Sequence, residues 1–239
     1  MQVVNLPEPD FKKRIAIAVQ WIANAKHFTV LTGAGISTEA GIPDYVSVRE
    51  IGEKPAKLTT PSALVKNWQK ASPGPAHFAL VNLQNVSVLK FLVSQNIDNL
   101  HIKSGIRPEI LSEIHGNLML ERCTKCGKTI SKFDERPPRC ECGGIFRPSV
   151  VKDDEDPSDL EWNRVQVHAR LADVLCAVGT SLSVEPVNSI LPMAKRQGAK
   201  IIIINQEPTQ MDNLADLRFF ERAGEVLNAI VAGLLSSRK

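Results

Sequence analysis

The sequence predicts an α/β fold: a Rossmann-like doubly wound parallel sheet with a small lobe inserted into it. Apolar runs of strand length alternate with segments of helical spacing, which is the pattern of parallel strands joined by helices. Residues 123–148 interrupt this alternation, because they are rich in Cys, Gly, Pro and charge and have too little apolar content for a core of their own. At 239 residues and 43% hydrophobic content, the chain is long enough for one main domain with a sizeable core.

The main domain is expected to begin with a helix at Phe11–Ala25 and to end with another at Ala223–Leu235, since apolar side chains recur at helical spacing in both. Four apolar runs between them are expected to form buried parallel strands: Phe28–Thr32, Val86–Ser94, Ala172–Gly179 and Lys200–Asn205. We expect this Rossmann-like domain to comprise residues 1–45, 76–122 and 149–239, with a proline-containing loop and modest helix at 46–75 and the small lobe at 123–148.

Polar residues follow three of these strands, at Thr32-Gly33, Gln95-Asn96 and Gly179-Thr180-Ser181. Ligands of open α/β sheets bind outside the carboxyl ends of the strands. We therefore expect these three segments to converge on one crevice.

Glycines at positions 33, 35 and 41 follow the first strand, within the run Gly33–Asp44. They leave the backbone bare, so peptide N–H groups and the start of a helix could meet a pyrophosphate there. The spacing differs from G-x-G-x-x-G, so the run alone is a weak dinucleotide signal, and an ordinary strand-to-helix turn is the alternative.

The small lobe carries four of the five cysteines, as Cys123-x-x-Cys126 and Cys140-x-Cys142. Four thiolates are the ligands of a closed tetrahedral zinc site, and the glycines at 127, 143 and 144 give tight turns their backbone freedom. Residues at i and i+2 of an extended segment point to one face, so the short C-x-C half can also present two sulfurs. We predict a zinc-ribbon lobe with a structural metal, against the alternatives of a disulfide or free thiols. Cys176 lies in an apolar strand and is expected to be a core residue.

Charge and hydropathy give no sign of a nucleic-acid or membrane partner. Lys and Arg number 29 against 26 Asp and Glu, a formal net charge of +3. No run of about eighteen apolar residues occurs, and Met1–Lys13 carries acids and prolines where a secretory signal needs an apolar core. With cysteine usage typical of a reducing compartment, these features predict a soluble cytoplasmic protein. None of them predicts an oligomeric state.

His115 is the leading candidate for a general base. It follows the apolar-periodic segment Ile106–Ile114 and precedes Gly116-Asn117, where the chain leaves one element. A histidine pKa can be tuned near neutrality for proton transfer, although a lone histidine is more often structural or solvated. Asn96 and Asp98 could hydrogen-bond a carboxamide, with a polar turn after a strand as the alternative.

Taken together and in this order, five pieces of the sequence resemble the sirtuins, the NAD-dependent protein lysine deacylases. They are the glycine run, Gln95–His101, His115-Gly116-Asn117 with the cysteine cluster, Gly179–Leu182, and Ile204-Asn205. The resemblance extends from about Ala23 to about Leu227, and Phe91–Cys126 and Gly179–Arg218 look most like the class IV branch. It implies NAD as cofactor, a structural zinc, a cofactor loop within 46–75, and an acylated-lysine protein or peptide as substrate.

In the family, the acyl oxygen of the substrate lysine attacks C1′ of the nicotinamide ribose as nicotinamide leaves, and the histidine of the His-Gly-Asn motif acts as general base on a ribose hydroxyl. By resemblance, the catalytic residues are His115, Asn96 and Asp98. Asn96, Ile97 and Asp98 are implied to form the nicotinamide pocket. The residues implied to bind NAD are Gly33, Ala34, Gly35, Ser37, Thr38, Pro43, Asp44, Tyr45, Gln95, Asn96, Ile97, Asp98, Gly179, Thr180, Ser181, Asn205, Gln206 and Ala223.

The other four histidines match no base motif and are expected to pack in the core or face solvent; they are His27, His77, His101 and His168, of which His77 belongs to a family-like helix start.

Two places depart from the sirtuin pattern. Most sirtuins have Phe-Arg after Pro-Asp where this chain has Tyr45-Val46, so a guanidinium that helps to order the cofactor loop is missing. Many sirtuins also have Phe-Gly-Glu where this chain continues from Ser149 into the acidic run Asp153–Asp156. That run is interpreted either as a solvated loop or as a rim that favours lysine-rich peptides.

The resemblance implies a deacylase that yields nicotinamide, O-acyl-ADP-ribose and the free lysine. A mono-ADP-ribosyltransferase or NAD glycohydrolase is the alternative, because another nucleophile or water can capture the same activated C1′. A non-enzymatic module that binds NAD or ADP-ribose is the third hypothesis. Val46 and the acidic run favour it, whereas His115 together with Asn96 and Asp98 argues against it.

Overall fold

A six-stranded parallel sheet forms the centre of the computed structural model, which describes residues 10–42, 68, 70–135, 137–151 and 155–237. The strand order is β3-β2-β1-β7-β8-β9, so the winding direction changes between β1 and β7. In doubly wound sheets, the binding crevice lies at the carboxyl ends of the two neighbouring strands between which the winding direction changes, here β1 and β7. The strands are β1 (Phe28–Thr32), β2 (Leu89–Ser94), β3 (Leu111–Glu113), β7 (Val174–Val178), β8 (Lys200–Ile204) and β9 (Leu217–Phe219).

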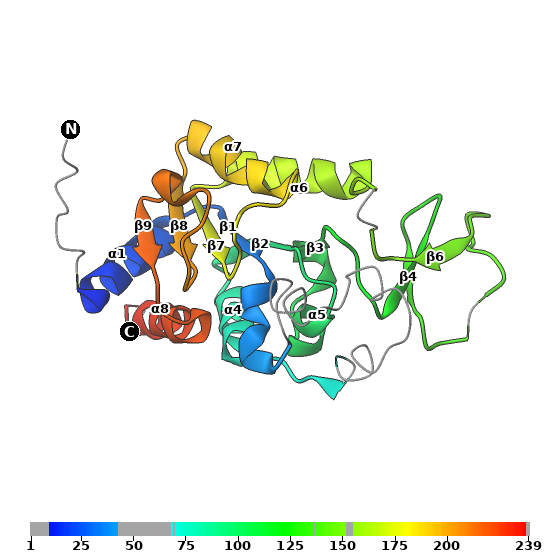
Figure 1. Cartoon of the computed structure of the whole chain (residues 1–239), viewed down its shortest axis with the longest axis horizontal. Helices are drawn as coiled ribbons and strands as arrows, with labels where there is room; N and C mark the ends of the chain where they lie inside the picture. The colour runs from blue at the N-terminus through cyan, green and yellow to red at the C-terminus, as the bar shows by residue number, and fades with distance from the viewer. Residues whose placement is uncertain (1–9, 43–67, 69, 136, 152–154, 238–239) are drawn as a thin grey trace.

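Helices cover both faces of this sheet, which explains why every residue of β1 and β7 is buried. Figure 1 shows α6 and α7 on one side, and α4, α5 and α8 on the other. Side chains of α1, α4 and α8 share one apolar cluster, and those of α6 and α7 share a second. The helices are α1 (Phe11–Asn24), α4 (Pro75–Asn85), α5 (Leu100–Ser104), α6 (Asp159–Leu171), α7 (Ile190–Arg196) and α8 (Ala223–Ser236).

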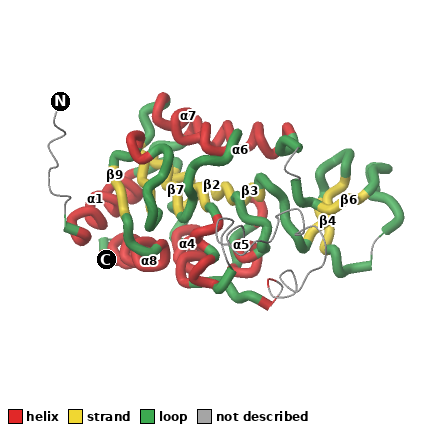
Figure 2. The backbone as a smooth tube through the Cα atoms, in the orientation of Figure 1, coloured by secondary structure: helices red, strands yellow, loops and turns green. Residues whose placement is uncertain are grey.

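A small antiparallel sheet forms the inserted lobe, with strand order β5-β4-β6. Its strands are β4 (Leu120–Cys123), β5 (Thr129–Ser131) and β6 (Phe146–Pro148). Figure 2 shows the lobe at the opposite end of the molecule from α8. Its buried apolar cluster consists of Cys123, Cys140 and Phe146, with Ile130 and Cys142 partly buried against them, which is too small a core to fold a lobe by burial alone.

The predicted α/β class with an inserted cysteine lobe is confirmed, as are the four apolar strands and the first and last helices. The second strand begins at Leu89 rather than at Val86, because Ser87 has a positive φ of 62° and turns the chain there. The edge strands β3 and β9 were not predicted. Short 3-10 turns complete the described elements: Ala34–Ile36, Thr38–Ala40, Pro108–Ile110, Val187–Ser189 and Asp212–Leu214.

Within the described parts of the chain, every helix is too short or too polar to cross a membrane.

Candidate active site

The polar segments that follow β1, β2 and β7 meet at the carboxyl ends of the strands, as expected. Thr180 Oγ1 donates a hydrogen bond to Gln95 Oε1 at 2.8 Å, which joins the exits of β7 and β2. Asn96 Nδ2 donates to the carbonyl oxygen of Gly33 at 3.2 Å, which joins the exits of β2 and β1. The three segments therefore line one site at the point where the winding direction changes.

The glycine run after β1 differs from the expected phosphate-binding turn. It continues into two 3-10 turns instead of a helix. The N–H groups of Gly33 and Gly35 donate to the carbonyl oxygens of Val178 and Gly179, at 3.0 and 2.8 Å. These two N–H groups bind the exit of β7 and are not directed at a ligand.

Close backbone packing explains the glycines at this junction. A Cβ on Gly35 would lie 2.8 Å from Gly179 Cα, and a Cβ on Gly179 would lie 2.5 Å from the backbone nitrogen of Ile36. Gly179 also has a φ of +61°, a conformation that disfavours every side chain. The glycines at 35 and 179 thus allow the ends of β1 and β7 to pack closely against each other.

Substitution of Gly179 by alanine is expected to destabilise the protein by more than the ~1–2 kcal/mol of a left-handed residue alone, because backbone atoms also block the Cβ. Gly198→Ala is the matched control: Gly198 has a φ of +88° but open space around its Cβ position. Urea unfolding of both variants measures the difference. Equal losses of unfolding free energy would show that close packing at this junction contributes nothing.

Ser37, Asn96 and Asp98 form a buried hydrogen-bonded group in the crevice. Ser37 Oγ donates to Asp98 Oδ2 at 2.6 Å and accepts from Asn96 Nδ2 at 3.0 Å. Asp98 Oδ1 accepts from the backbone N–H of Leu100 at 2.9 Å, at the start of α5. Both carboxylate oxygens are oriented by protein donors, and each keeps a lone pair for an amide donor of a ligand.

His115 lies just after β3, beside the same crevice. Its Nδ1 faces the carbonyl oxygen of Gln95 at 2.9 Å. Because a carbonyl can only accept, Nδ1 carries the proton of the neutral ring and Nε2 is the basic nitrogen. Burial lowers the pKa of His115 below its usual 6.5, against the opposing effect of the Gln95 hydrogen bond, so the ring is neutral at pH 7. This is the protonation state that a general base requires.

The other described members of the predicted nucleotide set lie along the same edge of the sheet, but several bond within their own loops. Thr38 Oγ1 donates to Gly35 O at 2.9 Å, Ser181 Oγ pairs with Ser183 Oγ at 2.8 Å, and Asn205 Nδ2 donates to Glu207 O at 2.7 Å. Ala34 lies in the first 3-10 turn, Ile97 accepts the Leu118 N–H, Gln206 is exposed after β8, and Ala223 begins α8. Pro43, Asp44, Tyr45 and Val46 lie outside the described residues, as do most of 46–75 and Asp153-Asp154.

Arg218 supports the loop after β8, although no sequence signal pointed to it. Its guanidinium donates to the carbonyl oxygens of Asn205 and Glu207, both at 2.7 Å, and to Asp212 Oδ1 at 3.0 Å. Arg218 lies on β9, an edge strand that the sequence did not predict. Its role depends on this pairing of β9 with β8.

The other histidines are packing residues, as predicted. His77 and His101 are fully buried with ring centroids 5.0 Å apart, and His101 Nε2 lies 2.9 Å from Thr32 Oγ1. His27 Nε2 and His168 Nδ1 are 3.0 Å apart near the amino end of β1. That end of the strand is opposite to the crevice.

The four cysteines of the lobe converge as a candidate metal centre. Their sulfurs all lie within 4.8 Å of one another, with 3.5 Å between Cys123 and Cys142 and 3.6 Å between Cys126 and Cys140. Zn–S bonds of about 2.3 Å in a tetrahedron require sulfur separations of about 3.8 Å, so the arrangement fits zinc. Gly127 and Gly143 have φ of +74° and +81°, as expected for the tight turns. Cys176 is fully buried in β7, also as predicted.

Comparisons with known proteins agree with this architecture. A model of the Sir2 family matches residues 33–186, more than half of the chain. The "NAD-dependent protein deacylase 2" of Pyrobaculum aerophilum is 37% identical over 230 residues, covering 88% of this chain and 92% of that protein. The "NAD-dependent protein deacetylase 1" of Geobacillus kaustophilus is 36% identical, covering 88% and 94%. A solved structure described as a Sir2 homolog–NAD complex superposes with a TM-score of 0.77 at 31% identity, covering 94% of this chain and 95% of that one. The chain therefore belongs to the Sir2 family.

Proposed function

We propose that this chain is an NAD-dependent protein lysine deacylase that yields nicotinamide, O-acyl-ADP-ribose and the free lysine. The observation that carries the proposal is the neutral His115, which donates its Nδ1 proton to Gln95 O and leaves Nε2 as the basic nitrogen, on a loop bonded to the one that carries the buried Asn96 and Asp98. Relatives named as deacylases and deacetylases, similar over 88% of this chain, support it.

The residues of the crevice fit a nicotinamide nucleotide. Bound NAD would supply the activated C1′ and nicotinamide as the leaving group. Asp98 would accept hydrogen bonds from the carboxamide, and Asn96 and Ser37 would hold that carboxylate in place. His115 Nε2 would accept a proton from a ribose hydroxyl.

The wider set proposed to hold NAD is the one predicted from sequence, and its described members follow β1, β2, β7 and β8 or, for Ala223, begin α8. Thr180, Ser181 and Asn205 would lie on the phosphate and adenosine-ribose side, with Gln206 and Ala223 near the adenine. For Gly33 and Gly35 we propose that the ligand packs against their backbone without a hydrogen bond to their N–H groups. Both N–H groups already donate to carbonyl oxygens at the exit of β7.

The cysteine cluster is proposed to hold a structural zinc. Four thiolates fill a tetrahedral shell and leave no open position for substrate or water. The lobe at 123–148 would then be a metal-held insert in a domain made of 1–45, 76–122 and 149–239, with the cofactor loop at 46–75. Its contribution to activity is to fix the chain that returns to the crevice.

The test is nicotinamide release from NAD in the presence of acetyl-lysine, longer acyl-lysine or unmodified lysine peptides, with mass spectrometry of the products. Release that requires an acylated peptide and gives O-acyl-ADP-ribose is expected. Release without peptide, with free ADP-ribose or ADP-ribosylated protein, would replace the proposal with a glycohydrolase or a mono-ADP-ribosyltransferase. Binding of NAD without release would indicate a non-enzymatic binding module.

A further inference from the structure

The Asn117 side chain lies at the centre of a partly buried hydrogen-bond group beside the crevice. Its amide nitrogen donates to both oxygens of Glu113, at 2.8 and 2.9 Å, and to Asn99 Oδ1 at 2.9 Å. Its Oδ1 accepts from the backbone N–H of Met119 at 2.9 Å. Asn117 is fully buried, so all of its hydrogen bonding is made with protein groups.

This group joins two loops that carry the proposed chemistry. Glu113 ends β3 two residues before His115. Asn99 directly follows Asp98 and adopts a left-handed conformation with a φ of 68°, which an asparagine tolerates when its side chain is bonded locally. Leu118 N–H also donates to Ile97 O at 2.9 Å. The distance between the His115 loop and the Asp98 loop is thus set by Asn117 and its neighbours.

A third segment, returning from the small lobe, closes the group. The backbone N–H of Asn117 donates to Ser149 Oγ at 3.0 Å, and the N–H of Val151 donates to His115 O at 3.0 Å. Gly116 has a φ of +80°, and any Cβ there would clash with the carbonyl of Ser149. The His115 loop therefore has little freedom to move independently of these three segments.

We propose that Glu113 is a positioning residue for deacylation, which acts through the Asn117 amide to hold His115 and Asp98 at their working separation. The inference rests on the proposed function. Glu113 has no contact with the basic nitrogen of His115, so its role is indirect. As a carboxylate it accepts both contacts from Asn117, whereas a protonated acid turns one oxygen into a donor and loses part of that link.

The surroundings of Glu113 favour a change of protonation near neutrality. Burial raises its pKa to about 7 against the lowering effect of the Asn117 hydrogen bond, with Asp98 and Glu161 raising it and Arg122 lowering it. Asp98 faces it from the loop after β2, Arg122 from β4, and Glu161 from α6.

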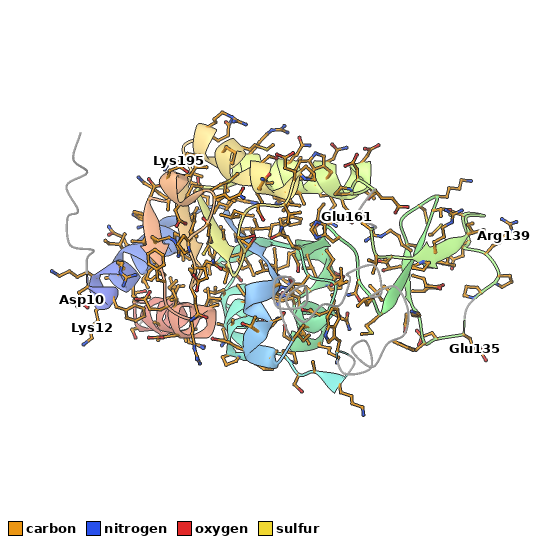
Figure 3. All side chains as sticks on the ribbon, viewed as in Figure 1. Asp10, Lys12, Glu135, Arg139, Glu161 and Lys195 are labelled. Carbon is orange, nitrogen blue, oxygen red and sulfur yellow. The ribbon has the colours of Figure 1, made fainter. Side chains whose placement is uncertain are left out.

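Arg122 pairs with Glu161, which also pairs with Arg164 at 3.4 Å. Arg122 contacts Glu161 Oε1 at 3.3 Å, and the second Glu161 oxygen accepts from Ser112 Oγ at 2.5 Å. Figure 3 places Glu161 near the end of α6 that is closer to the small lobe. The positive charge of Arg122 is therefore shared, and it does not fully compensate the Glu113 carboxylate.

The test compares the pH profile of kcat/KM for the acylated peptide in Glu113→Gln and in wild type, with Glu109→Gln as a control on an exposed position of the same stretch. Glutamine keeps the shape of the side chain but cannot ionise. The wild-type to E113Q ratio is expected to be near one at pH 5.5 and to rise to between about 10 and 100 as the pH passes through 7, since misplacement of a catalytic group by about 1 Å can reduce the rate 100-fold. Titration of His115 affects both proteins and cancels in this ratio where its pKa is the same in both, which an NMR titration of His115 in each protein checks.

A ratio that is constant with pH, or equal to that of E109Q, would overturn the inference. Absence of acyl-peptide turnover in wild type would instead overturn the proposed function.

A double-mutant cycle tests whether Glu113 acts through Asn117. If it does, E113Q adds less than about twofold to the loss of kcat in an Asn117→Ala background, whereas independent roles give multiplied losses. Thermal melting and zinc content of each variant are measured alongside. If N117A does not fold, the pH dependence of the wild-type to E113Q ratio of kcat/KM alone tests whether Glu113 is a positioning residue.

Discussion

His115→Ala is expected to reduce acyl-peptide-dependent formation of O-acyl-ADP-ribose by about 10²- to 10⁴-fold, the usual contribution of a positioned general base. The variant removes Nε2, the ring nitrogen that stays unprotonated when Nδ1 donates to the Gln95 carbonyl. Cofactor affinity should change little, because the proposed nicotinamide contacts come from Asn96 and Asp98. The measurement is steady-state product formation, with NAD affinity from ligand-induced thermal shifts.

His27→Gln is a suitable control for this experiment. His27 precedes β1 at the end of the strand opposite to the crevice, where it pairs with His168. Its substitution should leave turnover within about twofold of wild type. Comparable losses in both variants would mean that destabilisation, and not loss of the base, explains the effect of H115A.

The central strands could be predicted because their sequence signal is strong. β1, β7 and β8 are buried on both faces, so selection for burial leaves continuous apolar runs. The edge strands β3 and β9 are three residues long and pair with one neighbour each. Segments of that length have no periodicity that distinguishes them from a loop.

The parts of the site that directly follow a parallel strand could be predicted from sequence, because the end of the strand determines where they lie. The rule that ligands bind at the carboxyl ends of parallel strands placed Gln95, Asn96 and Thr180 together, and their hydrogen bonds confirm it. Cysteine spacing likewise indicated the complete metal centre.

Contacts between segments that are distant in the chain could not be predicted from the sequence. The packing of Gly35 on Gly179 joins residues far apart in the chain, and it explains why a glycine-rich turn has its N–H groups bonded to β7 and not free for phosphate. The link from Glu113 through Asn117 to Asn99 depends on the same kind of tertiary pairing. None of these residues forms a local motif beyond the His-Gly-Asn run.

Loss of the zinc is expected to unfold the small lobe and abolish deacylation while leaving the six-stranded sheet folded. Among the described residues of the lobe, the buried apolar cluster is limited to Cys123, Cys140 and Phe146, whereas a structural zinc supplies about 10–16 kcal/mol in small metal-dependent domains. Activity should fall with the lobe, because Ser149 and Val151, which contact the His115 loop, directly follow β6.

Cys126→Ser tests this with little disturbance of packing, since Cys126 is the exposed member of the four. Bound zinc, measured by atomic absorption, should fall from one per chain to well below stoichiometric, and protease cleavage should begin within 123–148. Cys176→Ala is the matched control, because Cys176 is buried in β7 away from the lobe and should retain zinc and activity. A zinc-free C126S protein with wild-type turnover would show that the lobe folds without the metal and that the His115 loop is held by the main sheet alone.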